Sequence, residues 1–496
     1  SLFWGFMLRK PWVEVERLTF APSVPPVNAI LWATPTEEKG KARLFDLKSK
    51  VGKLFWGGFV IGLLLTIPDI RTYVVPGIPP SAEWGYNLID LTIINRILPG
   101  AYGSYIFSIP EAIIWYIIPM DIALTAVIAQ AIVFFVYEPV GVALGWMPYV
   151  PASATSHTPY GMQYGPFQFI YFVRWGIVPG IAVWTIWTHR KHFINIFRVA
   201  FGASKGLPLE EDGVPYRLIG LGAITLSLLF IAFLTVNGIP LGVAIIFFLL
   251  WLMGMISQSK IVGECGDYEI VNSAWTPPLL WDAGAAIGAW PATAPHLSEG
   301  TFKTFWMNSA MGGGGPRFVG NLPYVINIWK VAYETKTRAK DMFIATFITF
   351  VVAAIVAGPV SIWWMHYLGG FAKLGPITYY TGARGAATTF TTTVPGDLLW
   401  TDAVKRWVFV VAGIALTFGI QIARARFPWF YLNVVGLVPA WRSDGFLLHR
   451  TVALVAKFLT LRVGGARLYS ETALPLAIGA IAGYGVMYFI TQLGWF

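Results

Sequence analysis

Long apolar stretches recur along the chain and constrain its fold more than any other sequence feature. Windows that approach or exceed the ~18–20 apolar residues needed to cross a ~30 Å hydrocarbon core as a helix lie at 54–75, 112–137, 166–188, 216–236, 239–257, 342–367, 406–423 and 471–494. None shows the period-2 alternation of a lipid-facing barrel. The sequence therefore predicts an all-α, polytopic transmembrane helix bundle with interrupted or re-entrant helices.

Composition supports a membrane protein. Of the 496 residues 56% are hydrophobic and 12% charged, against roughly 25% charged in soluble domains. The net charge of +10 comes largely from short basic loops beside the apolar windows. We therefore interpret it as a sign of membrane topology, since cytoplasmic loops are rich in Lys and Arg, and not as a sign of nucleic-acid binding. These loops, expected on the cytoplasmic side, are 39–53, 189–192, 336–340, 423–426 and 461–467.

Three domains are predicted. An N-terminal transmembrane bundle covers 1–257, a cytoplasmic or partly re-entrant connecting region covers 258–341, and a C-terminal transmembrane bundle covers 342–496. Counting crossings between basic loops requires one more crossing, which we assign to the polar, interrupted segment 85–108. Segment 427–461 must enter the membrane and return, as a re-entrant hairpin or as two short crossings. Because SLFWGFML is too short to span, we expect further helices upstream of Ser1.

Asp121 follows Pro119 inside an apolar window, which makes it the leading candidate for a functional site. A carboxylate in lipid costs at least ~2.5–3.5 kcal/mol on insertion scales, so it should face the bundle interior or pair with a cation. Arg174, beside a Pro-Gly break at 179–180, is the expected partner. The pair suits a midplane binding site in which Asp121 takes a proton, and equally a structural ion pair or a helix cap.

Glu111 and Glu264 are expected at the two mouths of that site. Glu111 follows Pro110 at the start of the same apolar window, where the helix macrodipole alone would favour an acidic residue. Glu264 stands four residues after Lys260, so the two could simply pair across one helical turn. We therefore predict substrate or ion binding by Asp121, Arg174, Glu111 and Glu264, with the structural alternatives left open.

The sequence offers little support for other chemistry. Its single cysteine, Cys265, rules out an internal disulfide and a cysteine-rich metal site, and its six histidines show no HExxH motif. No catalytic set is legible, so we expect neither an enzyme nor a cofactor, and no metal.

Several stretches resemble one family. LRKPWVEVERLTFAPSVPP (8–26) resembles the "wTErErLtyP" segment of a large, poorly characterised family of polytopic bacterial and archaeal membrane proteins. RFPWFYLNVVGLVPAW (426–441) and the stretch 457–479 resemble its C-terminal "RFPWWPLHPLG" and "K.l.lryGG.rlYr.alPf.lG" motifs, with Tyr431-Leu432-Asn433 in place of Pro-Leu-His. IIPMDIALT is similar to its "flMPlDll", and Glu264 and Gly266 match its "aElG". The family looks distantly like the oligopeptide transporters (OPT), which implies a secondary transporter with re-entrant segments.

We interpret the chain as a multi-pass protein of the prokaryotic cell membrane that transports a small organic or peptidic solute, with proton coupling as one option. Its partners would be the lipid bilayer and the solute, and a homo-oligomer or partner membrane subunits remain open. The alternative is a non-transporting structural subunit of a larger membrane assembly, in which the buried charges are structural.

Overall fold

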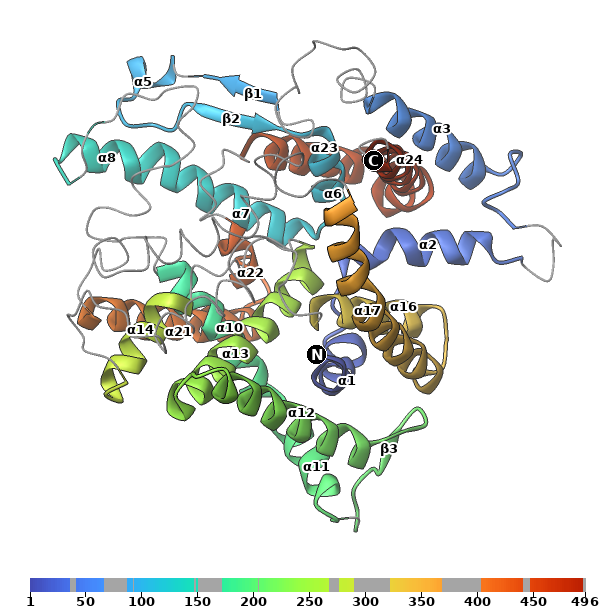
Figure 1. The fold of residues 1–496 in the computed structure, drawn as a ribbon. Coiled ribbons are helices and arrows are strands. Elements are labelled where there is room, and N and C mark those ends of the chain that lie inside the picture. The colour runs from blue at the N-terminus through green and yellow to red at the C-terminus, as the bar shows by residue number, and fades with distance from the viewer. Residues whose placement is uncertain are drawn as a thin grey trace. The chain divides into compact units, whose positions relative to one another are not determined.

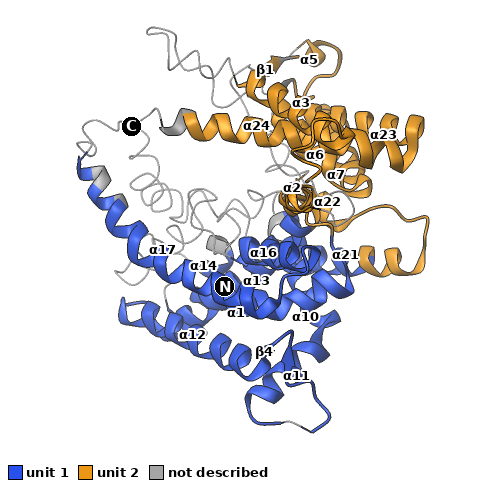
Figure 2. Cartoon of the chain, turned by 90° about the vertical axis from the view of Figure 1, so that its right-hand side faces the viewer, with its two compact units in different colours: residues 1–18, 171–263, 267–419 blue, residues 19–170, 264–266, 420–496 orange. Residues whose placement is uncertain are grey.

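The computed structural model describes residues 1–35, 42–66, 87–91, 93–146, 149, 172–203, 205–266, 276–289, 322–367, 403–439 and 447–493 (Figure 1). Almost all regular structure in these ranges is helical, which confirms the predicted fold class. The chain divides into two compact units, each built from segments far apart in the sequence. Unit 1 holds 1–18, 171–263 and 267–419, and unit 2 holds 19–170, 264–266 and 420–496 (Figure 2).

Six helical segments in the described part are long and apolar enough to cross a membrane: Met120–Ala143, Tyr216–Val236, Leu241–Cys265, Ala339–Val360, Trp407–Arg426 and Leu447–Ile490. The predicted windows 112–137, 216–236, 239–257, 342–367, 406–423 and 471–494 each overlap one of them. The windows 54–75 and 166–188 fall partly on shorter helices, and their remaining residues lie outside the described part.

Unit 1 is assembled from α1 (Leu2–Arg9), η1 (Lys10–Val15), η5 (Phe172–Ile177), α10 (Val178–Thr188), α11 (Arg190–Ala200), β3 (Glu210–Glu211), β4 (Val214–Pro215), α12 (Tyr216–Val236), α13 (Leu241–Cys265), α14 (Thr276–Ala286), α16 (Leu322–Glu334), α17 (Ala339–Tyr367) and α21 (Ala403–Arg426). The ends of α13 and α21 belong to unit 2. Helix α16, which lies in the predicted connecting region, buries Val325, Ile326 and Trp329.

The N-terminal segment is tightly packed within unit 1. A Cβ added to Gly5 would lie 2.6 Å from Cγ1 of Val325, so the glycine lets α1 approach α16. Just beyond η1, Glu16 pairs with Lys260 and accepts a hydrogen bond from Nε2 of His189 at 2.7 Å. Burial alone would raise the pKa of Glu16, but the His189 hydrogen bond and the Lys260 charge outweigh it and hold that pKa below its ordinary value.

Unit 2 is assembled from η2 (Ala21–Ser23), α2 (Val24–Ala33), α3 (Lys50–Leu65), β1 (Asn87–Asp90), α5 (Ile94–Ile97), β2 (Ser104–Phe107), α6 (Ile109–Ile117), α7 (Met120–Ile132), η3 (Val133–Tyr137), α8 (Glu138–Ala143), α22 (Val434–Leu437), α23 (Leu447–Leu468), η9 (Tyr469–Ala473) and α24 (Leu474–Leu493). The predicted interruption at 427–461 is present, since the four-residue helix α22 precedes α23. Residues 440–446 lie outside the described part, so the choice between a re-entrant hairpin and two short crossings stays open.

The predicted crossing at 85–108 is wrong. Strands β1 and β2 pair antiparallel with Asn87 opposite Phe107 and Asp90 opposite Ser104. Four-residue strands of ~3.4 Å per residue are too short to span a hydrocarbon core. The aromatic and β-branched residues of SYIF suit a strand, whereas Pro99 and Gly100, the latter at φ +88°, suit the connection between the strands.

Helices α3 and α24 of unit 2 pack backbone to backbone. Added Cβ atoms at Gly58 and Gly62 would lie 2.1 Å from the carbonyl oxygens of Leu476 and Ala480, and at Gly483 2.1 Å from that of Phe59. Glycines four residues apart form a notch on one helix face. Because both helices carry such a notch, their axes come closer than side chains would permit.

Candidate functional site

A break between α6 and α7 places Asp121. Helix α6 ends at Ile117, residues Ile118 and Pro119 are extended at ψ 145° and 141°, and α7 begins at Met120. Proline fixes φ and removes a donor, and it disfavours helix in the residue before it. Asp121 therefore lies in the first turn of a new helix, where the macrodipole stabilises a negative charge, and not in the middle of a continuous span.

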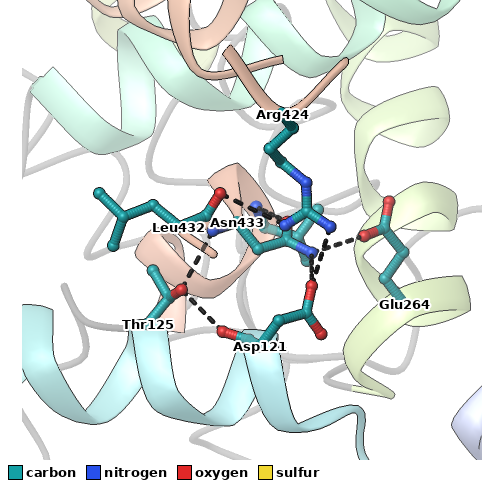
Figure 3. Close-up of polar contacts among 7 residues, drawn as sticks. Asp121, Thr125, Glu264, Arg424, Leu432 and Asn433 are labelled. Atoms are coloured by element: carbon teal, nitrogen blue, oxygen red, sulfur yellow. Dashed lines mark hydrogen bonds and ion pairs between the residues drawn. The ribbon is translucent and has the colours of Figure 1, made fainter. Parts of the chain in front are cut away.

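Arg424 is the charged partner of Asp121. Its Nη2 lies 2.9 Å from Asp121 Oδ2, and its Nη1 donates to the carbonyl of Leu432 at 3.3 Å (Figure 3). Arg424 stands in the last turn of α21, where a cation is favoured by the opposite end of the macrodipole. Each charge thus belongs to a helix end that suits it, and the pair joins the two helix ends.

Asn433 links two carboxylates. Its Nδ2 donates to Asp121 Oδ2 at 3.1 Å and to Glu264 Oε2 at 3.3 Å (Figure 3). Its Oδ1 is held by the backbone N–H of Val435 at 2.9 Å, as the N-cap of α22. This cap fixes the orientation of the amide, so both N–H donors point at the carboxylates.

A second chain of hydrogen bonds seats α22 on α7. The backbone N–H of Asn433 donates to Thr125 Oγ1 at 3.0 Å, and that hydroxyl donates to the carbonyl of Asp121 at 2.7 Å. Gly436 allows the approach, since a Cβ there would lie 2.7 Å from the carbonyl oxygen of Ile122. Asn433 and Thr125 are both buried, so water does not compete for these hydrogen bonds.

The outer part of the cluster is more open. The side chains of Arg424 and Asp121 are 32% and 26% exposed, whereas Asn433 is 4% exposed. The cluster formed by Asp121, Glu264, Arg424, Asn433 and Thr125 is therefore a partly accessible polar site on a broken helix; we call it the Asp121 cluster.

The structure brings together two of the four predicted residues, Asp121 and Glu264. Glu111 lies in the first turn of α6, which is capped by Ser108 Oγ at 3.4 Å from the backbone nitrogen of Glu111. Arg174 lies in η5, and its side chain is outside the described residues, so its expected pairing stays a prediction. In the structure the cation that binds Asp121 Oδ2 is Arg424.

Arg424 and Asn433 are missed by the sequence reasoning. Arg424 belongs to the basic run 423–426, which resembles an ordinary cytoplasmic loop, although it is the end of an apolar helix. A signal for Asn433 does exist, because it replaces the histidine of the "RFPWWPLHPLG" motif. That departure from the family pattern falls at the centre of the cluster.

No group of three or more His, Cys, Asp and Glu side chains within the described residues is placed to hold a metal ion. Polar contacts in the Asp121 cluster are instead made by protein donors and acceptors. The site thus has the means to bind a charged solute or a proton through its carboxylates, its amide and its guanidinium.

Comparison with known proteins places the chain in a family without assigning a function. No curated protein matches it. A family model described as "Family of unknown function (DUF6785)" matches residues 2–494. The match says nothing of the oligopeptide transporters, so that likeness stays a prediction. Because the match covers nearly the whole sequence, the chain belongs to the DUF6785 family, whose function is unknown.

Proposed function

We propose that this protein is a secondary transporter of the cell membrane, a carrier rather than an enzyme, and that the Asp121 cluster binds its solute. The observation that carries the proposal is a polar cluster of charged groups placed at the break between α6 and α7. Ionisable residues in apolar spans are costly and commonly mark substrate or proton pathways. Discontinuous helices of this kind supply binding sites in many transporters.

The charges of the cluster suggest the class of solute. Two carboxylates accept hydrogen bonds from one amide, and one of them also pairs with a guanidinium. Such a site favours a small organic or peptidic solute that carries an amino or guanidino group, whose N–H donors can replace Arg424 or Asn433 at the carboxylates. The exposure of Asp121 gives such a solute access, and protonation of a carboxylate would couple its movement to protons.

The structural reading, a non-transporting subunit of a membrane assembly, has its own support. Asp121 is already paired with Arg424 and Asn433, and an ion pair of this kind can hold helix ends together without binding anything. The two readings differ in what happens when both charges are removed together. If the ion pair is only structural, a neutral pair that can still hydrogen-bond should keep the protein folded. If the cluster binds a solute, transport requires the charges themselves.

The test compares Asp121→Asn with the double variant Asp121→Asn/Arg424→Gln, both in reconstituted vesicles. Size-exclusion chromatography and thermal melting measure folding. A pH-sensitive dye inside the vesicles measures the proton-coupled uptake of dialanine. We expect both variants to fold with unchanged yield and to lose uptake. The exposed carboxylate of Glu471, which pairs with Arg467, provides the control variant Glu471→Gln, which should transport normally.

A solute panel tests the proposed charge preference in the wild type. Dialanine, putrescine and arginine should raise the melting midpoint, and lactate and succinate should not. Stabilisation by the acids alone would show that the assigned solute class is wrong. Loss of folded protein in the single variant, with recovery in the double variant, would favour the structural subunit.

A further inference from the structure

The end of α6 forms the other side of the helix break from Asp121. A helix C-terminus leaves carbonyl oxygens without an intrahelical donor, and it carries the negative end of the macrodipole. In an apolar span each such carbonyl needs another partner, since lipid offers none. Ile117 and Ile118, which are both buried, present such carbonyls directly before Pro119.

Lys457 supplies the partner from α23. Its Nζ donates to the carbonyl of Ile118 at 2.6 Å and to that of Ile117 at 3.2 Å. Its side chain is buried, with 7% of the residue exposed. The ammonium also lies 4.9 Å from the ring centroid of Tyr469, whose π face attracts a cation. A nearby hydrogen bond of 2.9 Å from the Tyr116 hydroxyl to Thr460 Oγ1 fixes α6 against α23.

This combination has the chemistry of a site for a monovalent cation. Main-chain carbonyl oxygens replace the hydration shell of such ions in channels, and unwound helix ends coordinate coupling ions in transporters. The negative helix end and the aromatic face both favour positive charge. All of these groups are occupied by an ammonium ion that is covalently part of the chain.

We propose that the α6–α7 break is a monovalent-cation site whose resident cation is the Lys457 ammonium, so that the folded protein requires no free sodium or potassium ion there. The inference goes beyond transport, because it concerns which cation the folded chain requires. A purely structural lysine would fill space and donate hydrogen bonds. A resident cation must in addition be replaceable by a free cation of the same shape, and not by a neutral molecule.

The experiment measures the melting midpoint of purified protein at constant ionic strength. The wild type should melt at the same temperature in choline, sodium and potassium chloride. Lys457→Ala, which removes the chain beyond Cβ, should melt several degrees lower in choline chloride. Propylammonium has the three carbons and the nitrogen that are removed, so it should restore most of the loss in a saturable manner, and 1-propanol should not.

Two variants serve as controls. Arg462→Ala removes an exposed cation from the same helix and should not respond to propylammonium. Lys457→Met keeps an apolar side chain in place and leaves no room for the probe, so it should be destabilised and unresponsive. If Lys457→Ala yields no folded protein in choline, recovery of monodisperse protein in propylammonium but not in propanol supports the proposal, and recovery in neither opposes it.

Three outcomes would overturn the proposal. Restoration by propanol to the same extent would show that only volume matters. An unchanged midpoint of Lys457→Ala in choline would show that the break needs no cation. A wild type stabilised by sodium or potassium over choline would show that a free ion is required despite Lys457.

Discussion

At the scale of single residues, Asn433 holds the functional candidate together. One amide is oriented by the cap of α22 and divides its two N–H donors between Asp121 and Glu264. The carboxylates thus share a neutral donor, which lets two acidic groups lie near each other in a largely apolar chain. Sequence reasoning identifies Asp121 because a charge in an apolar window is conspicuous. It misses Asn433 because the one signal, the replacement of the motif histidine, does not say which groups the amide contacts.

Asn433→Asp tests this role with almost no change of shape. It replaces the shared donor by an oxygen that faces two carboxylates while keeping the acceptor for the Val435 N–H. We expect unit 2 to lose roughly 2–4 kcal/mol of unfolding free energy, because a buried negative charge is left without a partner. Chemical denaturation in detergent provides the measurement.

Asn237→Asp is the matched control. Asn237 is exposed, and its Nδ2 donates to the carbonyl of Phe233 at 2.7 Å without facing an acid. The substitution should change the unfolding free energy by less than roughly 0.5 kcal/mol. Equal effects of the two substitutions would contradict the role assigned to Asn433.

At the scale of elements, helix breaks and glycine notches determine which helices contact each other more than helix propensity does. Pro119 makes the α6–α7 break visible in the sequence, and the residues on either side carry the Asp121 cluster and the Lys457 contact. The partners themselves are not predictable locally, since Lys457 and Arg424 are each more than 300 residues from the groups that they bind at the α6–α7 break. The β1–β2 hairpin is missed for a related reason, because its apolar strands resemble part of a helix when they are read alone.

The close contact between α3 and α24 predicts that two adjacent glycines of α3 differ in how well they tolerate substitution by alanine. A Cβ at Gly58 would meet the backbone of Leu476 at 2.1 Å, whereas a Cβ at Gly57 would meet no atom within 4 Å. Gly58→Ala should therefore cost roughly 1–3 kcal/mol or more, since backbone must move. Gly57→Ala should be neutral or stabilise by up to ~1 kcal/mol, because alanine favours helix.

Melting of the two variants side by side checks this expectation. The pair shares one helix, one substitution and one membrane environment, so it isolates the interhelical contact. A similar loss in both variants would show that α3 and α24 do not pack through this face.

At the scale of the whole molecule, two units are interleaved along the chain. The apolar windows predict most membrane-length helices because hydrophobic length is a local property. The predicted division at 257/258 and 341/342 rests on the same local pattern, and it stays a prediction. Compact units are defined by contacts between distant segments, such as α1 with α16 and α3 with α24, and no local pattern specifies those contacts.

Unit 1 should lose stability in mild acid because of His192, which ties α11 to the N-terminal segment. Its Nε2 donates to the carbonyl of Met7 at 3.1 Å. Burial lowers the pKa of His192 to about 4 from an ordinary value of 6.5, although the Met7 hydrogen bond opposes the shift. The unfolded chain therefore binds a proton that the folded chain does not, so stability falls as the pH drops from about 6.5 towards 4 and is retained above that window.

Between pH 7 and pH 5 protonation of His192 should lower the free energy of unfolding by about 1–2 kcal/mol, with allowance for its partial exposure. The slope of the melting midpoint against pH across that range should be smaller in His192→Gln, whose amide retains a donor for the Met7 carbonyl. His366→Gln, at an exposed position of α17, should leave the slope unchanged. An unaltered slope in His192→Gln would contradict the assignment.

The pairing of α3 with α24 also sets an order of events during biosynthesis. Helix α3 emerges from the ribosome roughly 400 residues before α24, which at ~5–20 residues per second is a delay of roughly 20–80 s. During that interval the glycine face of α3 rests against lipid, a chaperone or the insertion machinery. Unit 2 is therefore completed only after translation has passed through all of unit 1, and truncated chains would leave the nascent α3 exposed to quality control.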